Sequence, residues 1–331
     1  MKRNNLKFNF LSLTTGVALL ILVAITNQLT KNQYFTQEIY PKIYHKIHSN
    51  YSGFFDFLSF SLGDVLYLFL IVFLIYKISK GLKEIIQKEF LKALKIFSQI
   101  LFFLMSFWVI FHWVWGFNYY KKPIIRSVRT EIPLDDLKSM ALQHFERAKR
   151  YSEQNLEFMP DSSVKVSLFS PLMRYFGVTG YFNPFSGEAQ RVGKIPLLQI
   201  PFTNAHELAH QKGWAREYEA NYIGYTNASK GDIPSRYSAE YAAMNYILRE
   251  IYAEDSIFVR NIINEFPPKM QVDRAERIRF HEKYKGIADE VFTELNHYFL
   301  KSNNQTEGIK SYSRFVELLH QDYLKSKDLA H

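Results

Sequence analysis

Two histidines and a glutamate within residues 203–225 have the spacing of a zinc hydrolase site. His206, Glu207 and His210 form the pattern HExxH. On a helix, residues four apart lie on the same face, so the two imidazoles could bind one zinc ion. Glu207 would then lie where a zinc-bound water is expected, and a carboxylate there can act as a general base. The motif therefore predicts a metal-dependent hydrolase.

A catalytic zinc usually has three protein ligands and one open position, so the motif requires a third ligand. Glu217 and Glu219 are the nearest acidic candidates. In an unbroken helix Glu217 would lie roughly 16 Å beyond His206, whereas zinc–ligand bonds are about 2 Å long. The chain must therefore turn, and Gly213 suits such a turn. A second helix that begins near Arg216 would return the carboxylates to the metal.

The stretch after the turn resembles the ExxAD pattern of gluzincin peptidases. Here Glu217, Ala220 and Asn221 give ExxAN, with Asn221 in place of the second acidic residue. In that pattern the first glutamate binds the metal, so the resemblance favours Glu217 over Glu219. The expected site comprises Zn2+ with His206, His210 and Glu217 as ligands, Glu207 as the base, and Glu219 as the alternative ligand.

Composition separates an apolar first third from a more polar remainder. The chain has 331 residues, no cysteine, and a formal net charge of +9 at pH 7. Without cysteine, no disulfide framework is possible, and a metal site must use histidine and carboxylate ligands. A basic chain could bind nucleic acid, but much of this charge flanks the apolar segments. We therefore expect lipid headgroups as partners, and no nucleic acid.

Three apolar stretches in the first third are long enough to cross a bilayer. They comprise residues 11–29, 57–76 and 96–117. No small-x-small cleavage site follows the first stretch cleanly, which favours an uncleaved span over a signal peptide. Six lysines and two glutamates lie between Lys77 and Lys95, and the positive-inside rule assigns this loop to the cytoplasm. Residues 1–120 would then anchor the chain in the inner membrane, with residues 121–331 outside the cytoplasm.

The region from residue 121 onwards has helical periodicity and one short β region. Apolar residues recur at helical spacing from Leu134, and further helical stretches are expected at 235–265 and 270–300. Between residues 164 and 202, short apolar pieces alternate with Gly and Pro, which indicates a small sheet. We therefore expect an α+β fold: a three-helix transmembrane region followed by a mostly helical, zincin-like domain. By analogy with zinc peptidases, the segment 181–190 is the candidate substrate-aligning strand, with a structural hairpin as the alternative.

Four stretches together resemble one bacterial family, domain of unknown function 3810. They are WGFNYYKKP (115–123), GYFNPFSGEAQ (180–190), PFTNAHELAHQKGWAREYEANYIGY (201–225) and NNQTEGIKSYSRFVELL near the C-terminus. The resemblance implies three N-terminal spans and a zinc-peptidase-like domain, with the ligands and base named above, and it implies no substrate. Tyr312 in the last stretch could donate a hydrogen bond to a developing oxyanion, although a buried structural tyrosine is the simpler interpretation.

These patterns favour a membrane-anchored zinc endopeptidase that acts on a peptide or protein substrate, either soluble or membrane-associated. A non-catalytic membrane sensor or scaffold is the alternative, and its structural zinc would have a closed site with four ligands, including both Glu217 and Glu219. An intramembrane protease would place HExxH inside an apolar span. The flanking sequences QIPFTNA and QKGWAREYE are too polar for that class.

Overall fold

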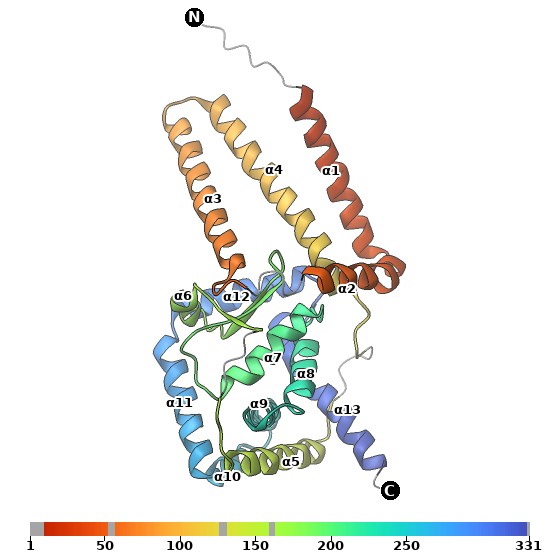
Figure 1. The fold of residues 1–331 in the computed structure, drawn as a ribbon, viewed down its shortest axis with the longest axis vertical. Coiled ribbons are helices and arrows are strands. Elements are labelled where there is room, and N and C mark those ends of the chain that lie inside the picture. The colour runs from red at the N-terminus through yellow and green to blue at the C-terminus, as the bar shows by residue number, and fades with distance from the viewer. Residues whose placement is uncertain (1–9, 52–56, 126–130, 159–162, 330–331) are drawn as a thin grey trace, which may run out of the picture. The chain divides into compact units, whose positions relative to one another are not determined.

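The computed structural model describes residues 10–51, 57–125, 131–158 and 163–329. These residues form helices and one small sheet, and the chain divides into two compact units. The first unit contains residues 1–46 and 63–121, and the second contains residues 47–62 and 122–331. In Figure 1 the helices α1, α3 and α4 of the first unit run from red to yellow, while green and blue elements belong to the second unit.

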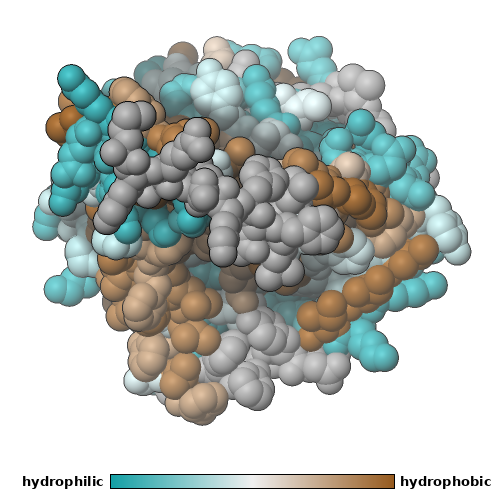
Figure 2. Space-filling model, turned by 90° about the horizontal axis from the view of Figure 1, so that it is seen from above, coloured by the Kyte–Doolittle hydropathy of each residue, from teal (hydrophilic) through white to brown (hydrophobic). Residues whose placement is uncertain are grey.

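Among the residues that the structure describes, three helices are long and apolar enough to cross a membrane. They are α1 (Phe10–Lys31), α3 (Leu62–Ile86) and α4 (Phe90–Val114). Many of their leucine, isoleucine, valine and phenylalanine side chains are exposed, and Figure 2 shows brown patches of hydrophobic residues on the face seen from above. Such surfaces are stable in lipid rather than in water. The chain is therefore a membrane-spanning protein, as predicted.

The ends of these helices differ from the predicted limits. The helix α3 begins at Leu62 rather than residue 57 and continues to Ile86 rather than residue 76. The helix α4 begins at Phe90 rather than residue 96. Lysines near these ends remain helical because their aliphatic stems can lie along apolar surface while the ammonium group reaches water. For example, Lys77 Nζ donates a hydrogen bond to Gln99 Oε1 over 2.8 Å.

Aromatic packing closes one end of the first unit. Here the π-helical turn η1 (Phe35–Ile39), the helix α2 (Tyr40–Tyr51) and the 3-10 turn η2 (Gly116–Tyr120) meet the end of α4. The fully buried ring of Phe117 lies 5.1 Å from the rings of both Phe35 and Tyr40, measured between centroids. Offset and edge-on aromatic pairs of this kind stabilise packing beyond their buried area.

Most of the core of the second unit lies among five helices, of which α5 and α9 make the most extensive contact. These helices are α5 (Leu134–Ser152), α9 (Ile233–Tyr252), α10 (Ser256–Asn264), α11 (Pro268–Tyr284) and α13 (Arg314–Asp328). Phe145 of α5, Ile247 of α9 and Phe315 of α13 are fully buried at its centre. Each such side chain stabilises the fold by roughly 1.5–3 kcal/mol relative to an exposed one.

A three-stranded sheet and five further helical elements complete the described part of the second unit. The strands are β1 (Lys165–Val166), β2 (Gly180–Asn183) and β3 (Glu188–Arg191), and the other elements are α6 (Ser170–Tyr175), α7 (Gln199–Gln211), α8 (Glu217–Ala228), α12 (Ile287–Ser302) and the 3-10 turn η3 (Gly308–Ser313). The strand order is β1-β3-β2, with β1 parallel and β2 antiparallel to β3. Both β2 and β3 contact α7. The expected mostly helical architecture with a small sheet is thus confirmed.

Two predicted helical stretches are each broken into two helices. The stretch 235–265 divides at Asp255, whose side chain accepts a hydrogen bond from Phe258 N over 2.9 Å and caps α10. The stretch 270–300 divides between Tyr284 and Ile287, around Gly286. An aspartate cap satisfies a free backbone N–H, and glycine costs a helix interior about 1 kcal/mol relative to alanine. The prediction of continuous helices here was wrong.

Candidate metal centre

The helix α7 carries the HExxH motif and ends in a turn that reverses the chain. Gly213 adopts φ +87°, a left-handed conformation in which glycine has no steric penalty. Its N–H donates to His210 O over 2.8 Å, and Trp214 N donates to Ala209 O over 3.1 Å. Helix α8 then begins at Glu217. The predicted turn at Gly213 and the predicted second helix are both present.

This turn brings the side chains of His206, His210 and Glu217 together. The two Nε2 atoms lie 3.1 Å apart, and Glu217 Oε2 lies 3.3 Å from His206 Nε2 and 3.5 Å from His210 Nε2. Tetrahedral zinc with bonds of about 2.0–2.2 Å requires its ligand atoms to be about 3.3–3.6 Å apart. The three atoms therefore have nearly the separation that one tetrahedral ion needs.

The imidazole of His210 is held by the same turn. Its Nδ1 lies 2.7 Å from the carbonyl oxygen of Trp214. A carbonyl only accepts hydrogen bonds, so Nδ1 carries the proton and donates it. In the neutral ring Nε2 then has the lone pair that a metal requires, as is common for metal-binding histidines.

Glu219, the alternative third ligand, has other partners. Its buried carboxylate accepts a hydrogen bond from Ile124 N at Oε1 over 2.8 Å. Both of its oxygens also lie 3.4 Å from Arg216 Nη1. Glu217, and not Glu219, is therefore the carboxylate that the structure places with the two histidines.

Glu207 is buried beside these three side chains and has a carboxylate oxygen without a hydrogen-bond partner. Its side chain is in the interior of the site, with the residue only 4% exposed, and Oε2 finds no partner among the described residues. Burial raises the pKa of Glu207 to about 7, although His206 and His210 oppose this effect. A buried carboxyl with an unsatisfied oxygen is costly in a purely structural role, because desolvation is not compensated.

The edge strand β2 passes directly over Glu207. An ideal Cβ placed on Gly180 would lie only 2.8 Å from Glu207 Oε1, so the close approach depends on glycine. The side chain of Gln211 holds the β2–β3 hairpin on α7 by donating to Gly187 O over 2.8 Å. The candidate segment 181–190 is this hairpin, and Gly180, which directly precedes that segment, lies against the base.

Electrostatics in the site favour a cation. Although burial opposes the change, the two imidazoles lower the pKa of the Glu217 carboxyl well below its usual range. The pKa of His210 is raised to about 9, because interactions with Glu217 and Glu207 outweigh the burial that lowers it. The buried carboxyl group of Glu207 and the partly buried one of Glu217 therefore draw positive charge to this point, which a divalent ion would supply.

Tyr312 of η3 also lies at this site, which the sequence did not indicate. Burial and the charge of Glu217 raise the pKa of the phenol well above its usual value, so the phenol lies close enough to Glu217 to interact with it. The role of Tyr312 as an oxyanion donor stays a prediction, as does the alternative of a buried structural tyrosine. Roughly ninety residues separate Tyr312 from Glu217, and no local pattern predicts a contact over such a separation.

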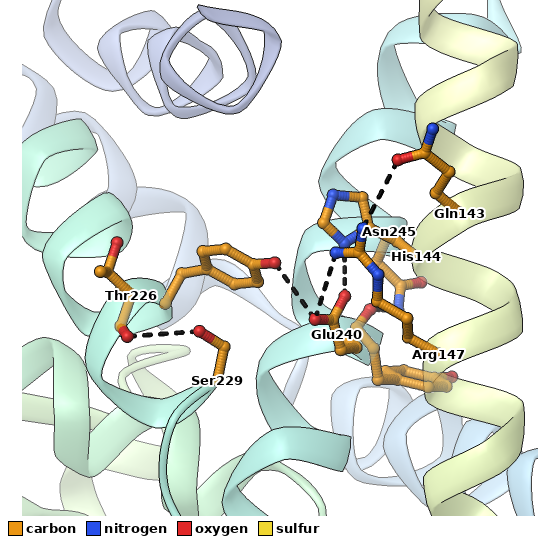
Figure 3. Close-up of polar contacts among 9 residues, drawn as sticks. Gln143, His144, Arg147, Thr226, Ser229, Glu240 and Asn245 are labelled. Atoms are coloured by element: carbon orange, nitrogen blue, oxygen red, sulfur yellow. Dashed lines mark hydrogen bonds and ion pairs between the residues drawn. The ribbon is translucent and has the colours of Figure 1, made fainter. Parts of the chain in front are cut away.

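Polar side chains around the buried Glu240 link α8 to α5 and α9. Glu240 of α9 accepts a hydrogen bond from Tyr225 OH over 3.1 Å at Oε1. His144 Nδ1 lies 2.5 Å from Oε2, and Arg147 Nη1 lies 3.7 Å from Oε1. Figure 3 shows His144 and Arg147 directed toward Glu240 from the neighbouring helix α5. Because Tyr225 is on α8, this cluster fixes the helix whose first residue is Glu217.

Comparison with known proteins identifies one family. A family model described as "Protein of unknown function (DUF3810)" matches residues 35–157 and 154–320 of the chain. No curated protein and no solved structure showed significant similarity.

Proposed function

The chain belongs to the DUF3810 family of proteins of unknown function, and we propose that it is a membrane-anchored, zinc-dependent endopeptidase. One observation carries the proposal: His206, His210 and Glu217 present three ligand atoms at tetrahedral spacing, and Glu207 lies beside them with an unsatisfied oxygen. Two histidines, one carboxylate and an adjacent glutamate form the donor set of a catalytic zinc site.

The chemistry is hydrolysis of a peptide bond. A zinc ion at this site would act as a Lewis acid toward the water and the substrate carbonyl. Glu207 accepts the proton of the attacking water and delivers it to the leaving amine. Its burial keeps the carboxylate close to neutral pKa, which suits a group that takes up and releases a proton in each turnover. The Trp214 carbonyl maintains His210 in the tautomer that binds metal.

The strand β2 supplies a place for the substrate backbone. It is an edge strand of the sheet, and an extended peptide can pair with such an edge through main-chain hydrogen bonds. Gly180 allows this edge to approach Glu207 closely. A bound peptide would therefore run past the general base, and the specificity would come from pockets for alternate side chains.

The position of Glu219 supports a catalytic site over a closed structural one. A closed site requires a fourth protein ligand, and Glu219 was the candidate. Its carboxylate instead accepts from Ile124 N and pairs with Arg216. Three protein ligands leave one coordination position for water or substrate, as in zinc hydrolases.

We place the catalytic unit outside the cytoplasm, on a protein of the inner membrane. The lysines between residues 77 and 95 lie on α3, α4 and their connection. The positive-inside rule assigns a lysine-rich loop to the cytoplasm. With three spans, the chain that follows α4 then lies on the opposite side of the membrane from the N-terminus.

The direct test uses the full-length protein in lipid nanodiscs, incubated with a broad peptide library. We expect wild type to bind one zinc per chain and cleave library members, and Glu207→Gln to keep the zinc but lose about 100-fold or more of the activity. The Gln side chain retains the size of Glu207, so the metal content serves as the folding control. Equal cleavage by the wild type and Glu207→Gln would refute the proposal.

A further inference from the structure

The segment that leads into α3 is anchored to the sheet by a buried glutamate. Glu188, the first residue of β3, accepts hydrogen bonds from Ser61 Oγ and Leu62 N, each over 3.2 Å. Lys165 Nζ of β1 donates to the same carboxylate over 2.7 Å, in an ion pair whose two side chains are less than a tenth exposed. Leu62 is the first residue of α3. Ser61 and Leu62, the residues of the second unit that lead into α3, are thus held on its sheet.

The register of the hairpin gives the separation between this anchor and the candidate metal centre. Glu188 pairs with Asn183 at one end of β2, and Gly180 at the other end approaches Glu207. Three residues of extended strand cover about 10 Å. The general base Glu207 therefore lies about 10 Å, measured along β2, from Glu188, the residue that binds the first residue of α3.

The helix α12 exposes one apolar face. Ile287, Val291, Leu295 and Tyr298 are between 53% and 80% exposed. At 100° per residue they fall within an arc of about 80°, while Asp289, Glu290 and Glu294 lie outside that arc. This pattern is typical of a helix whose apolar side is buried against a partner outside the second unit.

This face continues toward the anchored segment. The ring of Phe292 in α12 stacks on Phe176, directly after α6, with centroids 5.1 Å apart. Leu172 and Tyr175 of α6 are about half exposed. Val166 of β1 follows Lys165, the partner of Glu188, and is 46% exposed. Within the anchored segment itself, Phe57 and Phe60 are 77% and 41% exposed.

We propose that these side chains form a lipid-docking face, through which the second unit lies on the bilayer that α3 enters. The face is defined by Phe57, Phe60, Val166, Leu172, Tyr175, Ile287, Val291, Leu295 and Tyr298. The lipid bilayer is the occupant that the chain itself indicates, because the face includes the residues that directly precede the span. Amphipathic helices bury their apolar side about 5–10 Å into the boundary between headgroups and acyl chains.

A substrate class follows, and it rests on the proposed function. With the lipid-docking face on the bilayer and the general base about 10 Å along β2 from the start of α3, the site reaches peptide bonds close to the membrane surface. The substrate is therefore a juxtamembrane segment of a membrane-tethered polypeptide. Soluble peptides would bind only at higher concentration, because a tether raises the local concentration of the segment to the millimolar range.

The docking is tested with single cysteines, since the chain contains none of its own. Leu295→Cys and Phe60→Cys are labelled with an environment-sensitive fluorophore in nanodiscs that contain brominated lipids. The control is Ile257→Cys on α10, which is 64% exposed and lies at the opposite end of the second unit from α12 in Figure 1. We expect the brominated lipids to quench most fluorescence at positions 295 and 60 and little at 257. Equal quenching at all three positions, or energy transfer between labelled chains in place of lipid quenching, would overturn the docking.

The substrate class is tested with one randomised segment presented in three ways. In two substrates the segment follows a membrane span, after a linker of about 3 or about 20 residues, and each extended residue of the linker adds about 3.4 Å. In the third substrate the segment is supplied as a free peptide. We expect wild type to prefer the short tether by about 100-fold over the free peptide and Glu207→Gln to cleave none. Cleavage of all three at the same rate would overturn the juxtamembrane substrate class and leave the peptidase intact. Absence of any cleavage that depends on Glu207 would remove the peptidase and the substrate class together, while lipid quenching still reports on the docking.

Discussion

Gly180 of β2 and Glu207 of α7 approach each other so closely that no other residue fits at position 180 without a shift. An ideal Cβ at Gly180 would lie 2.8 Å from Glu207 Oε1 and 2.7 Å from Thr203 Cγ2. Contacts this short force neighbouring groups to move. The same approach therefore positions both the strand edge and the carboxylate of the proposed general base.

Substitution Gly180→Ala tests this relationship. The added methyl group would displace Glu207 or the edge of β2, and a misplacement of about 1 Å can reduce activity by about 100-fold. We expect zinc content to remain at one per chain while kcat/KM falls. Gly286→Ala is the matched control, because no heavy atom lies within 4 Å of its Cβ position. Wild-type activity in Gly180→Ala would show that this contact does not position the base.

The variants Glu217→Gln and Glu219→Gln show which of the two carboxylates binds zinc, a choice that the sequence left open. Loss of a charged ligand should weaken zinc binding by more than roughly 100-fold, since even changes beyond the ligands cost 10–100-fold. Glu219→Gln should retain zinc but lower the free energy of unfolding by about 1.5–3 kcal/mol, because it removes a buried charged partner of Arg216. Zinc titration and thermal unfolding measure both effects. The reverse pattern would assign the ligand to Glu219.

The activity should decline toward acid pH. Burial raises the pKa of Glu207 to about 7 in the metal-free protein, and a nearby cation would lower it again. A base acts only when deprotonated, so kcat/KM should fall as the pH drops through a midpoint at or below about 7. Zinc content is measured at each pH as the control, because acid also protonates the histidine ligands. A rate that is constant or rises from about pH 8 to about pH 5 would contradict the assigned role.

Removal of the metal should destabilise the second unit. Glu207 and Glu217 lie in the interior of the same site, and without a cation their desolvation is less well compensated. We expect a chelator to lower the apparent Tm, and zinc at about 100 times its Kd to stabilise by about 2.7 kcal/mol. The variant Glu217→Gln should respond to neither treatment. The same Tm for wild type with and without chelator would argue against a bound structural or catalytic ion.

The two histidines of the site and the turn that follows them could be predicted because their arrangement depends on helix geometry alone. Residues four apart share a face, and two histidines with a glycine shortly afterwards determine where the chain must turn. His206 and His210 thus predicted the turn at Gly213 and a carboxylate at the start of the next helix. The choice of Glu217 over Glu219 required the structure, because it depends on the contact between Glu219 and Ile124.

Contacts between distant parts of the chain were not predictable. Tyr312 lies beside Glu217, and Glu188 accepts a hydrogen bond from Ser61. In both pairs the residues are far apart in the sequence, and no periodic pattern connects them. The breaks near Asp255 and Gly286 were also missed, because the apolar spacing continues across both of them. In each case tertiary packing or a single capping side chain decided the outcome, while the pattern of apolar residues only indicated helix.

The proposed zinc site can be observed directly by X-ray absorption at the zinc edge of the full-length protein. We expect one zinc per chain with two imidazole nitrogens and two oxygens at about 2.0–2.2 Å, where one oxygen comes from Glu217 and the other from solvent. In Glu217→Gln the occupancy or the oxygen shell should change, and in Glu219→Gln both should stay the same. A protein that binds no stoichiometric zinc, or a coordination shell that is unaltered in Glu217→Gln, would contradict the assigned site.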